Sequence, residues 1–231
     1  MKVQSLVDHV KKYLEQSIVK GELSPGDKIK EEEVSSRLGI SRPPIREAFK
    51  LLEAEGLITR RARRGVFVSE ITEKDVWEIY TLKSAIYWLG TGFAIEHLSE
   101  KGLKKLENVV DMMGECVKQE PANVARYQKL NEDFHNIMID MAGHQRVRKI
   151  LSNLNNQIRR LSYQSMQSHI HIWSSYQYHK QILEAVKKKD MDLAQRLTRE
   201  HVLKGLTVLQ SMLEKSLQPD NDKKTRKVAA F

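Results

Sequence analysis

Apolar and polar positions follow two different patterns on either side of residue 70. Before it, two helical stretches are followed by two runs of β-branched or aromatic residues, 57–60 and 66–68, around a glycine-containing turn. This order predicts helix, turn, helix and β-hairpin. At about 100° per residue, one apolar stripe is expected along the second helix: Ile45, Ala48, Phe49 and Leu52.

From about residue 74 onward, apolar residues recur at helical spacing and strand signals vanish. Six helices are predicted, over residues 74–97, 100–118, 121–141, 145–167, 171–188 and 190–215. Because these segments are polar outside their apolar stripes, we expect them to be stable only when packed against each other. The sequence therefore predicts a mainly α protein: an N-terminal winged helix-turn-helix with a small β-hairpin wing, and a C-terminal all-α antiparallel helical bundle of six or seven helices.

These patterns also predict the domain organisation of the chain, whose 231 residues suffice for two cores. We expect a winged helix-turn-helix domain over residues 1–70, a linker over 71–74 and a helical domain over 75–215. Residues 216–231 are expected to form a disordered basic tail, because Pro219 cannot continue the last helix.

The second helix of the N-terminal domain is basic beside its apolar stripe. Arg42 and Arg46 fall roughly 110° from the stripe. The Ser41 hydroxyl is expected to cap the helix, and Pro43 and Pro44 lie where no intrahelical N–H is needed. A recognition helix needs this division, because a core holds one face while N-terminal residues reach the major groove. Arg42 and Arg46 are candidates for bidentate contacts with guanine or phosphate.

The predicted wing adds a second basic element directly downstream. Its turn carries three arginines: Arg61, Arg63 and Arg64. Guanidinium groups this close repel each other unless an anion lies beside them, so a phosphate backbone or a minor groove is the expected partner. A solvated basic face would explain either element alone. The two together favour double-stranded DNA.

The overall composition agrees with a polyanionic partner and argues against a disulfide-stabilised or membrane-spanning protein. The formal net charge is +9. Cys116 is the single cysteine, so an intrachain disulfide and a thiolate zinc cluster are excluded. No apolar run reaches the length of a membrane span and no signal-peptide pattern is present. We expect a cytoplasmic protein with no membrane partner.

Four stretches of the N-terminal domain carry a more specific pattern, at residues 21–29, 38–42, 46–48 and 55–58. They resemble the N-terminal domain of the GntR family of bacterial transcription regulators. The resemblance implies DNA contacts from Ser41, Arg42, Arg46 and Gly65, with Arg61, Arg63 and Arg64 added by their position in the wing. Glu32 stands where relatives often have arginine, and Pro43 where they often have threonine. The preferred operator sequence is therefore expected to differ from the usual one of the family.

Four residues of the predicted bundle are spaced so that their side chains could converge. Asn131 and His135 are four positions apart on the third helix and share a face. His179 lies near the middle of the fifth helix, and His201 lies in the sixth. In a chain with eight histidines such a triple also arises by chance. Spacing alone leaves satisfied or exposed histidines as the default.

The local patterns around these residues, at 131–135, 141–144, 179–185 and 190–201, are similar to the FCD domain, the helical effector domain of FadR-type GntR regulators. This resemblance implies a divalent metal, and a small carboxylate effector beside it, held by Asn131, His135, His179 and His201. Imidazoles suit zinc best here, with nickel, manganese or iron as alternatives. Neutral Asn131 is expected to be a weaker ligand than aspartate.

The effector would also need a cation from the bundle. Relatives often carry an arginine in the first bundle helix where this chain has Lys83, which could meet an anion as a point charge. Arg159 and Arg160 are further candidates. The remaining histidines fall outside the motif and are expected to be structural or exposed: His9, His97, His144, His169 and His171.

The sequence as a whole predicts a homodimeric, effector-responsive repressor that binds a pseudo-palindromic operator through two winged domains. Effector binding is expected to shift the bundles and so the spacing of the recognition helices. One alternative is a metal-dependent enzyme, because three histidines with open positions resemble a hydrolytic centre. An enzyme would not need residues 41–65, however, and no general base is evident. The other alternative is an architectural DNA-binding protein that responds to no ligand.

Overall fold

The computed structural model describes residues 5–119 and 121–217. The N-terminal part consists of α1 (Leu6–Lys20), β1 (Lys28–Ile29), α2 (Glu31–Leu38), α3 (Arg42–Ala54), β2 (Ile58–Arg61) and β3 (Gly65–Val68). The three strands form an antiparallel sheet in the order β1-β3-β2, with Ile29 opposite Val66 and Thr59 opposite Phe67. Strand β1 was not predicted, because two residues are too short to show an alternation.

The predicted apolar stripe of α3 forms the centre of the N-terminal core. All four of its residues are buried, together with Val10, Leu14 and Ile18 of α1. Ser41 has the extended backbone of an N-cap residue, but its hydroxyl makes no capping hydrogen bond, so that expectation was wrong. The two prolines in the first turn already pre-form the helix start, which makes a side-chain cap unnecessary.

The C-terminal part consists of α4 (Glu73–Glu96), α5 (Glu100–Val117), α6 (Val124–Ala142), α7 (Gln145–Ser165), α8 (His169–Lys187) and α9 (Met191–Leu217). The predicted helices are all present, with ends moved by local caps. For example, α6 begins later than predicted because Asn123 caps it, and α8 begins earlier because Ser168 caps it. Residues 216–217 belong to α9, and the rest of the predicted tail, 218–231, lies outside the described residues.

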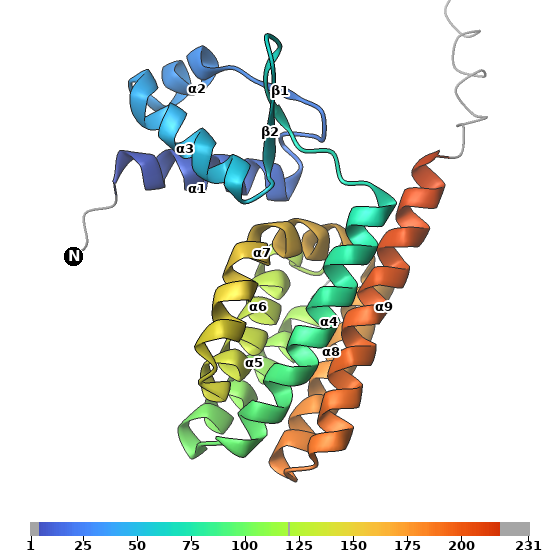
Figure 1. Cartoon of the computed structure of the whole chain (residues 1–231). Helices are drawn as coiled ribbons and strands as arrows, with labels where there is room; N and C mark the ends of the chain where they lie inside the picture. The colour runs from blue at the N-terminus through green and yellow to red at the C-terminus, as the bar shows by residue number, and fades with distance from the viewer. Residues whose placement is uncertain (1–4, 120, 218–231) are drawn as a thin grey trace, which may run out of the picture.

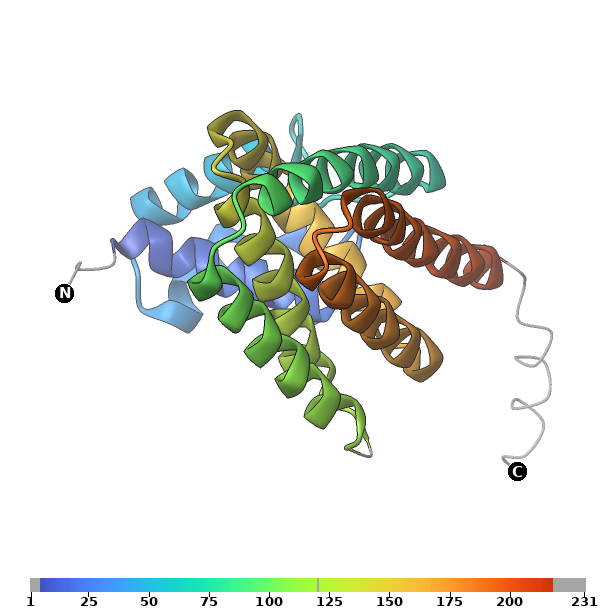
Figure 2. The same cartoon turned by 90° about the horizontal axis from the view of Figure 1, so that it is seen from below.

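The bundle helices pack side by side around a shared apolar core. Helix α4 lies along α9, α5 along α6, and α8 between α9 and α5 (Figures 1 and 2). The largest cluster of buried apolar residues lies among α5, α6, α8 and α9 and includes Phe134 and Ile182. Buried Cys116 belongs to this cluster. Within residues 5–119 and 121–217, no helix combines the length and the apolarity needed to cross a membrane.

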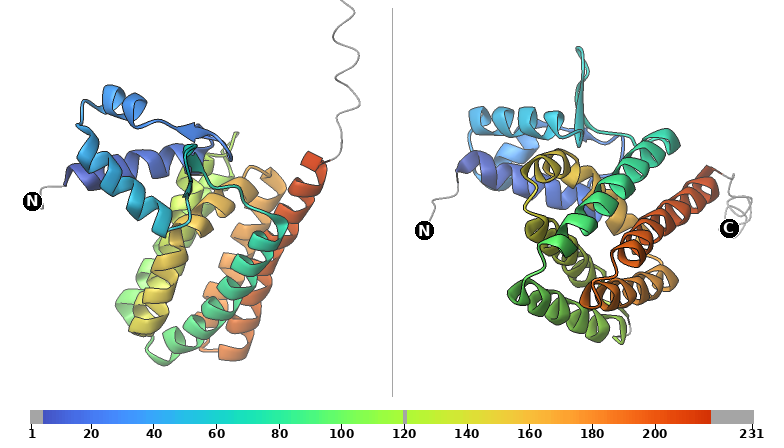
Figure 3. Two further views of the ribbon diagram at one scale, coloured as in Figure 1. Left: turned by 45° about the horizontal axis from the view of Figure 1, so that its top comes forward. Right: turned by 60° about the horizontal axis from the view of Figure 1, so that its bottom comes forward.

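The N-terminal domain sits on the end of the bundle that the C-terminal half of α7 reaches, with the wing pointing away from the bundle (Figures 1 and 3). Helix α7 makes hydrogen bonds across this junction. Asn156 donates to Glu15 Oε1 at 2.9 Å and to Glu55 Oε2 at 2.6 Å. Arg160 Nη1 donates to the Ser69 carbonyl at 2.8 Å. Helix α7 therefore links the two domains.

Candidate DNA-binding surface and metal centre

The start of α3 presents Ser41, Arg42 and Arg46 to solvent, on the side away from the core. Both arginines are paired with carboxylates of α2: Arg42 Nη2 lies 2.8 Å from Glu32 Oε1, and Arg46 Nε lies 2.9 Å from Glu31 Oε2. Exposed ion pairs of this kind are weak and exchange readily with other anions. The guanidinium groups therefore remain accessible to DNA, although the surface is less positive than the sequence predicted.

The tip of the wing exposes Arg61, Arg63, Arg64 and Gly65. Arg61 lies over the ring of Phe67, 4.8 Å from its centroid. Arg63 adopts a left-handed backbone with φ of 61°, which costs energy for a residue with a Cβ atom and is commoner at functional positions. Among the described residues, no carboxylate pairs with Arg63 or Arg64. These two side chains are the unpaired cations of the predicted DNA-binding surface.

Three imidazoles meet inside the bundle, one each from α6, α8 and α9. The candidate ligand atoms of His135, His179 and His201 all lie within 4.8 Å of one another, and all three residues are buried. Nδ1 of His179 is 2.7 Å from the Ser175 carbonyl. This bond places the proton on Nδ1 and directs the free lone pair of Nε2 into the cluster, as in histidines that bind metals.

The buried polar atoms around these imidazoles lack hydrogen-bond partners. In the described part of the chain, five buried side-chain atoms have none: Asn131 Oδ1, His135 Nε2, His171 Nδ1, His179 Nε2 and His201 Nδ1. Orphaned buried atoms are rare in folded proteins, and a cluster of them calls for a bound species. One amide oxygen and three imidazole nitrogens form a donor set that fits a divalent metal. The residues present therefore fit the metal that the sequence implied.

The electrostatics of the cluster favour the form of histidine that binds metals. Burial holds the pKa of His135 and of His201 well below the ordinary value, and the neighbouring imidazoles add to the effect. Burial lowers the pKa of His179 to about 4. All three imidazoles are therefore neutral at pH 7, and no proton has to be displaced before a metal binds.

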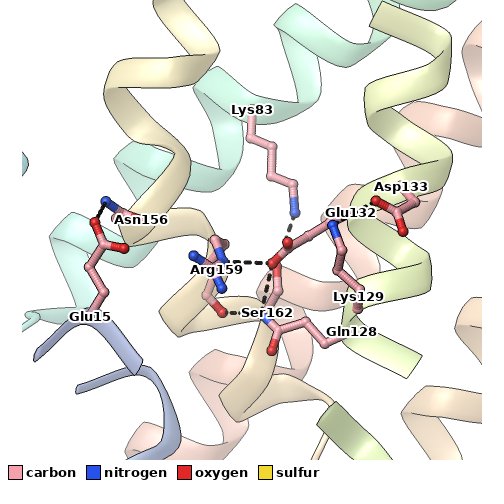
Figure 4. Close-up of polar contacts among 9 residues, drawn as sticks. All are labelled: Glu15, Lys83, Gln128, Lys129, Glu132, Asp133, Asn156, Arg159 and Ser162. Atoms are coloured by element: carbon pink, nitrogen blue, oxygen red, sulfur yellow. Dashed lines mark hydrogen bonds and ion pairs between the residues drawn. The ribbon is translucent and has the colours of Figure 1, made fainter. Parts of the chain in front are cut away.

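A small cavity of about 20 Å³ adjoins the cluster, lined by residues that include Asn131, His201, Lys83 and Ser162. Lys83 is buried, and its Nζ donates a hydrogen bond to Ser162 Oγ at 3.3 Å (Figure 4). Burial lowers the pKa of Lys83 to about 8, so the side chain is still mostly charged at pH 7. The cavity is large enough for about one water molecule.

The other two basic candidates for the effector lie elsewhere. Arg159 Nε pairs with Glu132 Oε1 at 2.9 Å, and Gln128 donates to the Arg159 carbonyl (Figure 4). Neither Arg159 nor Arg160 lines the cavity that holds Lys83. Of the three cations that the sequence proposed, only Lys83 reaches this cavity.

His171 was expected to be structural or exposed, and the structure places it inside the bundle. It is buried, lines the same cavity as Lys83, and leaves Nδ1 without a partner. A sequence signal existed: His171, Ser175 and His179 recur every four residues and so follow one stripe of α8.

Comparison with known proteins identifies both halves of the chain. Residues 6–68 match the gntR family of bacterial regulatory proteins, and residues 78–204 match the FCD domain. The chain belongs to the GntR family. It is a DNA-binding transcriptional regulator with an FCD domain, and the enzyme alternative is therefore dropped.

Relatives of this GntR-family regulator cover most of its length. The transcriptional regulator YdhC of Bacillus subtilis (strain 168) is 29% identical over 192 residues, covering 82% of this chain and 83% of that protein. The transcriptional repressor RspR of Escherichia coli (strain K12) is 27% identical and covers 86% of each chain. The gluconate operon transcriptional repressor of B. subtilis is 27% identical, covering 90% of this chain and 89% of that protein.

Solved structures agree on the fold of the regulator. E. coli McbR/YncC superimposes with a TM-score of 0.78 at 17% identity, covering 91% of this chain and 100% of that one. A GntR transcriptional regulator from Rhodococcus sp. RHA1 superimposes with a TM-score of 0.74 at 19% identity, covering 89% of this chain and 97% of that one. At these identities the likeness concerns the fold alone.

Proposed function

We propose that the protein is a homodimeric repressor whose operator binding is controlled by a small carboxylate held beside a divalent metal in the bundle. One observation carries this proposal: the orphaned buried side-chain atoms of the described residues all belong to Asn131 and four histidines. A regulator that needed the bundle only for dimerisation would have no use for such a cluster, since each orphaned buried atom destabilises the fold.

The DNA contacts are proposed for the exposed start of α3 and for the wing. Ser41, Arg42 and Arg46 would enter the major groove, since an N-terminal turn of a recognition helix meets base edges there. The wing would place Arg61, Arg63, Arg64 and the Gly65 backbone against phosphates or the adjacent minor groove. A pseudo-palindromic operator follows from a two-fold symmetric protein. Because its partner is DNA, we expect the protein to act in the cytoplasm.

Asn131, His135, His179 and His201 would hold the metal. We favour zinc, because imidazole nitrogens suit it; nickel, manganese and iron also accept this donor set. A bound metal would supply an electropositive centre with positions that can accept a carboxylate oxygen.

The cavity beside the cluster would receive the effector. Lys83 supplies a positive charge from α4, and His171 supplies a polar ring from α8. The cavity holds only about one water molecule, so any organic acid must widen it by moving the walls. Effector binding is therefore coupled to a change in helix positions.

Helix α7 would carry that change to the DNA-binding domain. Ser162 and Ser165 line the cavity, and Ser162 bonds Lys83. Less than one turn earlier on the same helix, Arg160 bonds the Ser69 carbonyl at the domain junction. A shift of α7 that admits the effector would thus move the contacts that seat the winged domain.

Homodimerisation is proposed through α4. This helix exposes large apolar side chains: Trp77, Leu82, Trp88 and Leu89 are each more than a third exposed, with Trp77 at 53%. These four side chains, the exposed apolar row of α4, favour a protein–protein interface on this helix. A second copy of the chain, related by a two-fold axis, would cover it.

The sign of regulation is proposed from two of the relatives described above, because RspR of E. coli and the gluconate operon regulator of B. subtilis are named transcriptional repressors. Binding of the metal-loaded protein to an operator fragment, measured by fluorescence anisotropy with and without a panel of small mono- and dicarboxylates, tests the function. We expect one acid to weaken operator binding about tenfold or more, and Lys83→Met to remove that response. If no acid changes the affinity, an architectural DNA-binding protein becomes the better description.

A further inference from the structure

A second cavity, of about 360 Å³, lies at the junction of the two domains. Pro25 contributes to its wall from the loop between α1 and β1, and Ile71 from the segment between β3 and α4. The rest of the wall comes from the bundle and includes Val76 of α4, Leu161 and Gln164 of α7, and Leu209 of α9. It shares no lining residue with the cavity beside the histidines.

Arg160 is the charged residue of this cavity and is 2% exposed. Its hydrogen bond in the described part of the chain is the one from Nη1 to the Ser69 carbonyl, and no carboxylate there pairs with it. A guanidinium has five N–H donors, and burying its charge without a counter-ion is costly. The neighbouring Arg159, by contrast, has Glu132 as a partner. An unbalanced buried cation on a cavity wall points to an anionic ligand.

The other residues of the wall indicate that the ligand is apolar apart from its anionic group. Side chains such as Val76, Leu161, Leu209 and Met212 are apolar, and Gln164 and Gln167 are neutral. A volume of 360 Å³ lies within the usual range of small-molecule sites. A doubly charged anion would leave one charge against apolar walls. A single carboxylate on an apolar chain fits better, because the carboxylate can pair with Arg160 and the chain can contact the apolar walls.

We propose that this junction cavity is a second ligand site, which binds a medium-chain monocarboxylate with its carboxylate on Arg160 and its hydrocarbon chain along α4, α7 and α9. The site does not depend on the metal or on Lys83. Because Pro25 and Arg160 belong to different domains, a ligand there contacts both and adjusts how the winged domain sits on the bundle.

The test is calorimetric titration of octanoate into the full-length protein. We expect saturable binding that octylamine does not show. Arg160→Gln is expected to weaken it by about tenfold or more, because a hydrogen-bonded charge partner is lost. Gln164→Glu leaves the bond from Arg160 to Ser69 in place and adds a negative charge at the rim, which is expected to weaken binding about threefold or more. Gln164 is exposed, so this variant is expected to fold normally.

Two control variants test whether octanoate binds in the junction cavity and not elsewhere on the protein. Gln181→Glu makes the same charge change at an exposed position of α8 and should leave octanoate binding unchanged. Lys83→Met, in the other cavity, should change it by less than about twofold, since Lys83 does not line the junction cavity. Loss of binding in Lys83→Met would place octanoate beside the histidines and overturn the proposal, without affecting the proposed function.

The proposal is also overturned if millimolar octanoate does not bind the wild-type protein, or if Gln164→Glu and Arg160→Gln bind it as well as wild type does. Binding that appears only after dilution to monomers would show that a second copy of the chain occupies the cavity, and would equally overturn it.

Discussion

Arg42 on the recognition helix lies against Glu32 on α2, with 2.8 Å between Nη2 and Oε1. Arg46 and Glu31 form a similar pair at 2.9 Å. The two carboxylates occupy the neighbourhood that phosphate oxygens or base edges would need. Binding of DNA therefore requires the arginines to exchange one anionic partner for another, and the displaced glutamates remain close to a polyanion.

The first prediction follows from that exchange. Glu32→Gln removes a carboxylate that competes for Arg42 and repels DNA, so operator affinity should rise by about three- to tenfold at low salt, with a smaller gain at high salt. Fluorescence anisotropy across a salt series measures it. Glu100→Gln, at an exposed position of α5, makes the same charge change away from the DNA-binding surface and should have no effect. A fall in affinity would instead show that Glu32 accepts a hydrogen bond from a base.

The second prediction concerns the unpaired arginines of the wing. Arg63→Ala and Arg64→Ala should each weaken binding to all DNA sequences alike and reduce the slope of log affinity against log salt by about one, because one phosphate contact is lost. Lys104→Ala, exposed on α5, should leave the slope unchanged. A change in sequence preference without a change in slope would mean that the wing reads bases.

The third prediction tests the metal ligands. Asn131→Asp replaces a neutral oxygen donor with an anionic one, so zinc affinity should rise by about tenfold. His201→Ala should abolish stoichiometric binding, as measured by competition with a chromogenic chelator. His97→Ala is the matched control, since His97 is exposed and lies outside the cluster. Full zinc binding by the His201 variant would contradict the assignment.

The fourth prediction uses the lowered pKa of Lys83, which is about 8 against an ordinary value of 10.5. Between these values the unfolded chain holds a proton that the folded chain has released, so stability rises with pH through this window. Below it, the buried charge destabilises the fold. Lys83→Met should therefore raise the free energy of unfolding at pH 7 by about 1–3 kcal/mol.

Urea unfolding of wild type and Lys83→Met between pH 7 and pH 10.5 measures this difference, which should shrink as the pH rises. In addition to burial, the Lys83 charge lowers the pKa of His135, His171, His179 and His201, but these histidines titrate below pH 7 and so contribute alike to both proteins within this window. A constant difference across the window would show that the effect comes from packing and not from the charge.

The fifth prediction concerns the dimer. Trp88→Glu places a charge in the exposed apolar row of α4, so the protein should sediment as a monomer and lose operator affinity, because two half-sites are no longer bound together. Trp173→Glu, a substitution at a comparably exposed tryptophan of α8, should remain dimeric. A Trp88→Glu variant that stays dimeric would place the interface on another surface.

Local patterns predicted much of the fold. The buried stripe of Ile45, Ala48, Phe49 and Leu52 follows from the helical period. Helix ends were less accurate, because single capping residues such as Asn123 and Ser168 decide them. Strand β1 could not be predicted, since its two residues are held by pairing with distant β3.

The candidate site was also predictable only in part. The residues of the histidine cluster were proposed from their spacing and from a family resemblance, and the structure brings the three imidazoles together. The partners of these side chains could not be predicted from the sequence. Arg159 forms an ion pair with Glu132, Arg42 forms one with Glu32, and His171 lines the same cavity as Lys83.

The sequence by itself determined which segments are helical, which faces are apolar and where cationic and imidazole groups lie along each helix, because these depend on interactions within a few residues. Only the tertiary structure decided which charges are neutralised, which polar atoms are left without partners, and that Arg160 lines a cavity between two domains. Such properties depend on groups far apart in the chain, whose approach is set by how whole helices pack.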